Sequence, residues 1–97
     1  MIFDCTASYS SGVITLTTQN TMKNTVNTIR FTAPNDYLTT DILKINGTTY
    51  TLKDTACEAL DEGAWKTGAI ILLNINTNLK TAYYSTSGGD YVPVFGT

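Results

Sequence analysis

The stretch that most constrains the fold runs from Asp41 to Asp54, where two extended segments flank the dipeptide Asn46-Gly47. Both residues of this pair tolerate a positive φ, which a type I′ turn requires at its two central positions, so the pair is a strong hairpin signal. A two-residue loop places the apolar side chains of both segments on one face: Leu43, Ile45, Tyr50 and Leu52. A shift of one residue would scatter this set, so turn and pattern predict the same register.

The first third of the chain shows further alternation of apolar and polar residues, as in strands with one buried face. Residues 2–7 and 13–18 are predicted to pair as an N-terminal hairpin across a loop at 8–12. Residues 26–33 form the next strand, with Ile29, Phe31 and Ala33 facing inward. Pro34 ends this strand because proline has no N–H for the ladder of a sheet.

The last third contains the strand expected to be the most buried. Residues 69–75 are apolar on both faces through Leu73, and residues 80–85 are their expected antiparallel partner. Between the hairpin and this strand, Thr55 and Glu58 match a capping box, which predicts one or two helical turns or an ordered loop. Residues 91–95 are expected to form an edge strand or an arm, because Pro93 excludes a central position.

These segments predict an all-β fold. We expect a single small antiparallel sandwich or barrel of about seven strands, with at most one short helix near residues 55–61. Residues 1–97 form one β domain, and residues 86–97 are its candidate for an extended arm.

The charge content is low, at 14% of the residues against about 25% in an average domain. The six basic residues are scattered, which argues against nucleic acid as a partner. The longest apolar run, residues 69–73, is far shorter than the roughly 18 residues of a membrane helix, so no membrane partner is expected. The N-terminus lacks the basic residues of a signal peptide.

The chain has no histidine, which removes the commonest general base and the commonest transition-metal ligand. Two cysteines, Cys5 and Cys57, cannot build a four-coordinate zinc site by themselves. We expect both to be buried free thiols, with a single long-range disulfide as the alternative. The residue types therefore predict no catalytic residues, no metal and no cofactor.

Four acidic residues cluster between positions 54 and 62: Asp54, Glu58, Asp61 and Glu62. A carboxylate pair for glycoside hydrolysis or an oxygen-lined calcium site would use such residues. No EF-hand spacing is present, and the favoured interpretation is the solvated face of a loop or short helix.

The aromatic residues are the candidate contacts with a ligand or a neighbouring subunit: Trp65, Tyr37, Tyr83, Tyr84 and Tyr91. Trp65 with one of the tyrosines would make a stacking platform for a sugar ring. Large aromatic side chains dominate small cores and subunit contacts, so a core or interface position is favoured for Trp65. Tyr83 and Tyr84 point to opposite faces if they lie on a strand, which leaves one of them outside the core.

Three motifs follow one another in a recognisable order: Ile-Asn-Gly-Thr-Thr-Tyr at 45–50, Gly-Ala-Trp-x-x-Gly-Ala at 63–69, and Thr-Ala-Tyr-Tyr at 81–84. This order resembles small β-rich modules in tail, baseplate and fibre proteins of tailed bacteriophages that infect Gram-positive bacteria. The resemblance covers residues 29–84 and contains no catalytic motif.

The resemblance implies a non-enzymatic virion structural or interaction protein, in a tail, tail fibre or head fibre. Its implied partners are further copies of itself, for example in a trimer, and other virion proteins. Its implied location is the virion, which assembles in the host cytoplasm. The alternative that the sequence leaves open is a carbohydrate-binding module for a host cell-surface glycan.

Overall fold

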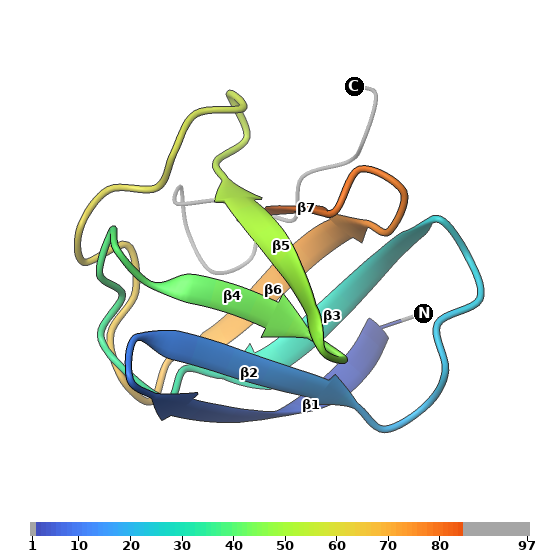
Figure 1. Ribbon diagram of the computed structural model, residues 1–97, viewed down its shortest axis with the longest axis horizontal. Helices are drawn as coiled ribbons and strands as arrows, with labels where there is room; N and C mark the ends of the chain where they lie inside the picture. The colour runs from blue at the N-terminus through green and yellow to red at the C-terminus, as the bar shows by residue number, and fades with distance from the viewer. Residues whose placement is uncertain (1, 85–97) are drawn as a thin grey trace.

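The computed structural model describes residues 2–84 as a closed barrel of seven strands (Figure 1). The order of the strands around the barrel is β1-β2-β4-β5-β7-β6-β3. The predicted all-β class is confirmed, whereas the expected arm at residues 86–97 lies outside the described residues. The bounds are β1 (Ile2–Ser10), β2 (Val13–Thr18), β3 (Val26–Thr32), β4 (Ile42–Ile45), β5 (Thr48–Lys53), β6 (Ile70–Asn76) and β7 (Thr81–Tyr83).

The pairing of the strands is mixed, so the expectation of a purely antiparallel arrangement is wrong. Neighbours joined by a tight turn are antiparallel, as in β1–β2, β4–β5 and β6–β7. Three further pairs, β1–β3, β2–β4 and β5–β7, are parallel. Two parallel neighbours need a long connection between them. Here the two strands of each parallel pair are separated in sequence by at least one other strand and its loops. Tight-turn signals in a sequence reveal only the antiparallel pairs.

Both predicted hairpins form. In β4–β5, Leu43 lies opposite Tyr50 and Ile45 opposite Thr48, as the pattern requires. Asn46 and Gly47 have φ values of 51° and 84°, both in the left-handed region that a type I′ turn uses. The β1–β2 hairpin turns at residues 11 and 12, so β1 extends through positions that were expected to be loop.

The core lies inside the barrel and takes alternate side chains from the strands. Its largest fully buried members are aliphatic: Ile14, Leu16, Ile29, Leu43, Ile45, Ile71, Leu73 and Ile75. Burying an aliphatic side chain of this size contributes roughly 1.5–3 kcal/mol. Burial of these inward-facing aliphatic side chains therefore drives the closure of the barrel.

Strand β6 is buried on both faces only over residues 73–75, where the outward Asn74 is buried together with the inward Leu73 and Ile75, so the expectation for residues 69–75 is wrong for the start of the strand. Ile70 is 63% exposed and Leu72 is half-buried, while Ile71 and Leu73 are buried. In a closed barrel each strand has one inner and one outer face, so the first outward side chains of β6 are not covered by the barrel itself.

The segment between β5 and β6 forms an ordered loop, and no helix is present among residues 2–84. The Asp54 carboxylate accepts hydrogen bonds from the backbone N–H groups of Ala56 and Glu58, at 2.8 and 3.0 Å. Cys57 adopts a φ of 64°, which interrupts any helical run. A helix of two turns is marginal without tertiary support, and here Asp54 satisfies the backbone donors instead.

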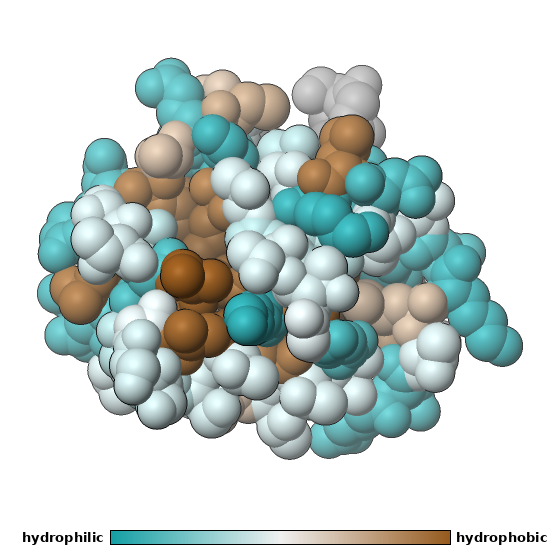
Figure 2. All heavy atoms as spheres, viewed as in Figure 1, coloured by the Kyte–Doolittle hydropathy of each residue, from teal (hydrophilic) through white to brown (hydrophobic). Residues whose placement is uncertain are grey.

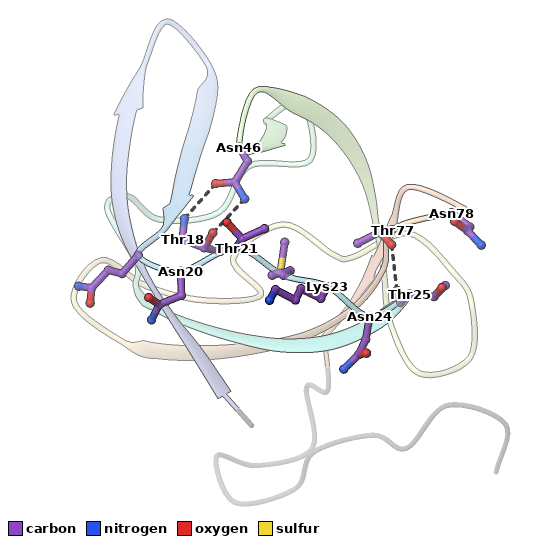
Figure 3. Close-up of a pocket in the computed structure, with 11 residues that line it drawn as sticks. Thr18, Asn20, Thr21, Lys23, Asn24, Thr25, Asn46, Thr77 and Asn78 are labelled. Carbon is purple, nitrogen blue, oxygen red and sulfur yellow. Dashed lines mark hydrogen bonds between the residues drawn. The ribbon is translucent and has the colours of Figure 1, made fainter.

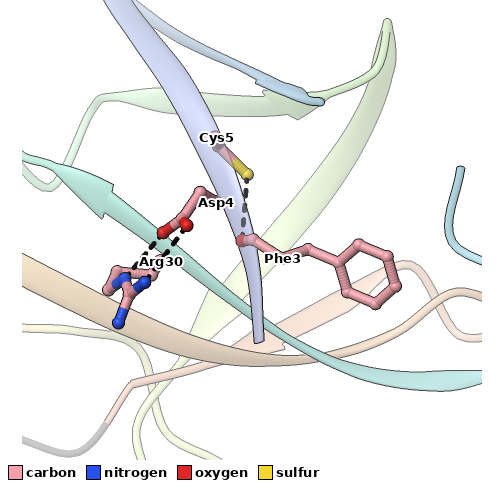
Figure 4. A network of polar contacts seen from close by, with 4 residues as sticks. All are labelled: Phe3, Asp4, Cys5 and Arg30. Atoms are coloured by element: carbon pink, nitrogen blue, oxygen red, sulfur yellow. Dashed lines mark hydrogen bonds and ion pairs between the residues drawn. The ribbon is translucent and has the colours of Figure 1, made fainter. Parts of the chain in front are cut away.

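On the outer surface, Asp4 of β1 and Arg30 of β3 form a two-pronged ion pair (Figure 4). Arg30 Nε and Nη2 donate to the two Asp4 carboxylate oxygens at 2.7 and 3.1 Å. These hydrogen bonds hold the pKa of the Asp4 carboxyl below its ordinary value. Exposed ion pairs contribute little to stability, so this one mainly helps to define the parallel register of β1 and β3.

The two cysteines are free thiols that lie in different surroundings. Cys5 is half-buried against the core, and its Sγ donates to the Phe3 carbonyl at 3.8 Å (Figure 4). Burial, and secondarily the Asp4 charge, raises the pKa of the Cys5 thiol to about 11. Cys57 is exposed because its loop lies outside the barrel, so the expectation that both cysteines are buried is wrong for this residue.

We expect this difference to appear in alkylation by iodoacetamide. The thiolate is the reacting species, so a thiol with a raised pKa reacts slowly at about pH 8, where an ordinary thiol is partly ionised. Cys57 should therefore be labelled at least about tenfold faster than Cys5 in the native protein. Peptide mass spectrometry measures both rates, and the Cys57→Ser variant isolates the slow site. Equal labelling rates under native conditions would contradict the assignment, whereas equal rates in urea are expected.

Candidate functional site

The loops at residues 33–41 and 54–69 close one end of the barrel, and Trp65 lies inside this end. Its ring centroid lies 5.0 Å from that of Tyr37, 5.8 Å from that of Phe31 and 5.3 Å from that of Tyr84. The Trp65 and Tyr37 side chains are only 3% and 5% exposed. The structure thus brings three of the sequence-predicted site residues together with Phe31, as a plug of packed rings. Burial raises the pKa values of the Tyr37 and Tyr84 hydroxyls.

Backbone pairing between the two loops holds this plug in place. The Tyr37 N–H donates to the Trp65 carbonyl at 3.0 Å, and the Gly63 N–H donates to the Tyr37 carbonyl at 2.9 Å. Gly63 and Gly68 have positive φ values, which let the chain fold Trp65 back over the open end of the barrel. The Gly-Ala-Trp-x-x-Gly-Ala motif therefore supplies a core residue.

Two further candidate aromatics remain, Tyr83 and Tyr91. Tyr83 is half-buried on β7, next to the fully buried Ala82. Tyr91 lies outside the described residues. Neither Trp65 nor Tyr37 offers a ring face on which a sugar could stack.

The acidic cluster does not assemble a site among the described residues. Asp54 holds the backbone of its own loop, and Glu62 Oε1 accepts from the Thr39 N–H at 2.7 Å. Glu58 and Asp61 are exposed. Within residues 2–84, no group of three His, Cys, Asp or Glu side chains is placed to hold a metal ion.

The opposite end of the barrel carries a polar cavity of about 510 Å³ (Figure 3). Three segments that are distant in sequence line it: residues 18–25, from the last residue of β2 to the start of β3, Asn46 at the tip of the β4–β5 hairpin, and residues 77–78 between β6 and β7. The strand directions bring these connections to the same end, as the right side of Figure 1 shows.

Hydrogen bonds fasten both ends of the 18–25 segment to the barrel. At one end, Asn46 Oδ1 accepts from the Thr18 N–H at 3.0 Å, and Asn46 Nδ2 donates to Thr18 Oγ1 at 2.9 Å. At the other end, the Thr77 N–H and hydroxyl both donate to the Thr25 carbonyl, at 2.8 and 3.2 Å. The cavity therefore has firmly attached walls (Figure 3).

The lining is almost entirely neutral and hydrogen-bonding. Of the eleven described residues that line the cavity, nine are Thr, Asn or Gln, and the other two are Met22 and Lys23. Met22 is half-buried and packs against the core, which gives the cavity one apolar contact. Four amide side chains make no hydrogen bond within residues 2–84 and are free to bind a ligand: Gln19, Asn20, Asn24 and Asn78.

Sequence reasoning did not identify this cavity. In the sequence, residues 19–24 are simply a polar stretch that interrupts the alternating pattern, and the dipeptide Asn46-Gly47 predicts only a turn. The available signal was compositional, since the connections at 18–25 and 76–78 are both rich in Thr and Asn. Their convergence depends on the mixed order of the strands.

Comparison with known proteins found no matching family model, no matching curated protein and no matching solved structure. Among residues 2–84, the structure contains no helix that is long and apolar enough to span a membrane.

Proposed function

We propose that this chain is a non-enzymatic structural and interaction protein of a tailed-bacteriophage particle, in a tail, tail fibre or head fibre. It works as a homo-oligomer, for which we propose a trimer, and contacts other virion proteins. The order of the three motifs at 45–50, 63–69 and 81–84 supports this function through its resemblance to phage modules. The observation that carries the proposed self-association is an apolar pair on the outside of the barrel.

This pair consists of Val13 on β2 and Ile42 on β4, which are register partners in the parallel ladder. The next residues of both strands, Ile14 and Leu43, are buried inside, so Val13 and Ile42 point outward. Ile42 is 46% exposed. Figure 2 shows brown apolar spheres gathered over this part of β2 and β4, with white and teal polar residues around them.

Removing water from the surface around the pair costs little free energy. The outward residues next to it on β2 and β5 are threonines, namely Thr15 and Thr51, and the nearest outward charge on β4 is Lys44. Interface cores are depleted of charged residues and enriched in apolar contacts. An apolar pair with a weakly charged rim is therefore suited to packing around a three-fold axis, where the pairs of three copies meet.

Light scattering of the purified chain at two concentrations tests this proposal. We expect a stable homo-oligomer for the natural sequence and a monomer for Ile42→Asp. Each copy would lose roughly 1.5–3 kcal/mol of apolar burial and would also have to bury a carboxylate. Because Ile42 points away from the core, the variant should keep the circular dichroism spectrum of the parent.

Leu79→Asp is the matched control, since Leu79 is exposed in the β6–β7 turn at the opposite end of the barrel. It introduces the same charge in place of an aliphatic side chain and should leave the oligomer intact. A natural chain that is monomeric at both concentrations would overturn the proposed self-association. Equal dissociation by both variants would show that Val13 and Ile42 do not form the contact.

A further inference from the structure

We propose that the polar cavity at the 18–25 end of the barrel binds a neutral sugar unit of an oligosaccharide. Its hydrogen bonds come from the four free amide side chains, Gln19, Asn20, Asn24 and Asn78. This inference rests on the chemistry of the cavity and is independent of the proposed self-association.

The size and attachment of the cavity suit a small ligand. Its volume of about 510 Å³ lies within the range of roughly 300–1,000 Å³ that is usual for small-molecule sites. The clamps at Thr18–Asn46 and Thr25–Thr77 hold the lining segment at both ends. A segment that is already held loses less conformational freedom when a ligand binds, which favours affinity.

The functional groups match vicinal hydroxyls. An Asn or Gln side chain carries a carbonyl acceptor and an NH₂ donor in one plane, and a threonine hydroxyl both donates and accepts. Two adjacent sugar hydroxyls likewise offer donors and acceptors a short distance apart. Met22 adds an apolar contact for the C–H face of a sugar ring, which its flexible thioether side chain can follow.

Other classes of ligand fit the cavity less well. A phosphate-rich polymer requires several cations, and Lys23 is the one charged residue among the described residues of the lining. Single-stranded nucleic acid is usually held by aromatic stacking platforms, and none of the lining residues within 2–84 is aromatic. A calcium ion would need carboxylate ligands, and the part of the lining that the structure describes contains none.

The cavity and the apolar pair lie at opposite ends of the barrel. Val13 and Ile42 begin β2 and β4, whereas Thr18 and Asn46 stand at or just beyond the ends of the same strands. Self-association through Val13 and Ile42 would therefore leave the cavity open to a glycan.

The test is an NMR titration of the ¹⁵N-labelled chain with maltotriose, chitotriose and lactose, preceded by a screen on an array of neutral glycans. We expect a neutral saccharide to shift the side-chain NH₂ signals of Asn20 and Asn78. Asn20→Ala and Asn78→Ala should each weaken binding about tenfold, since each removes a paired donor and acceptor. Thr49→Ala, on the outer face of β5 and not among the residues that line the cavity, should bind as the parent does.

Charge provides the second readout. Added sodium chloride screens charged contacts but hardly affects neutral hydrogen bonds, so the affinity should not change with salt. The proposal is overturned if no neutral glycan binds on the array or in solution. It is also overturned if the affinity is unchanged in both Asn variants, or if inorganic phosphate shifts the same signals more than the sugars do and Lys23→Met abolishes that shift. None of these three outcomes would affect the light-scattering test of self-association.

Discussion

Replacement of Trp65 by alanine is expected to lower the free energy of unfolding by about 3–5 kcal/mol, as removal of a large aromatic side chain from a core does. Trp65 packs against the rings of Phe31, Tyr37 and Tyr84, and it is only 3% exposed. Its loss would leave a cavity under the loops 33–41 and 54–69. Equilibrium unfolding in urea, followed by circular dichroism, measures the change.

Trp65→Phe is the informative companion variant. The indole Nε1–H of Trp65 is buried and has no hydrogen-bond partner among residues 2–84. A buried donor without a partner costs about 1–3 kcal/mol, so removing it offsets part of the lost ring volume. We therefore expect Trp65→Phe to lose less than half as much stability as Trp65→Ala. Equal losses in the two variants would mean that the indole nitrogen is satisfied in solution.

Leu73→Ala is expected to lower the free energy of unfolding by about 2–5 kcal/mol. Leu73 is fully buried on β6 and lies directly opposite Ile29 of β3, so the alanine variant leaves a cavity in the middle of the barrel. The same urea experiment measures the loss.

Leu72→Ala is the matched control for Leu73→Ala, because it removes the same atoms from the neighbouring position of the same strand. Leu72 points outward and is only half-buried. Its replacement should cost under about 1 kcal/mol, since a surface site leaves no enclosed cavity. Similar losses at positions 72 and 73 would show that β6 is covered on both faces in solution, as its apolar sequence by itself suggests.

The candidate cavity shows where sequence reasoning stops. Asn46 was identified as a turn residue from its neighbour Gly47 alone, and its φ of 51° confirms that role. Its second role, the pair of hydrogen bonds to Thr18, joins residues 28 positions apart and follows from the parallel pairing of β2 with β4. Trp65 was favoured as a core or interface residue from its size, but its partners Phe31 and Tyr84 come from distant segments.

The sequence by itself determined the features that depend on a few neighbouring residues. The Asn46-Gly47 turn, the register of β4–β5 and the inward faces of β2 and β3 follow from local φ preferences and from the two-residue period of a strand. Only the tertiary structure decided the three parallel pairings, the outward exposure of Ile70 and the convergence of the loops around the cavity. Long connections allow a strand to return beside several partners at similar entropic cost, so packing of the whole core selects the arrangement.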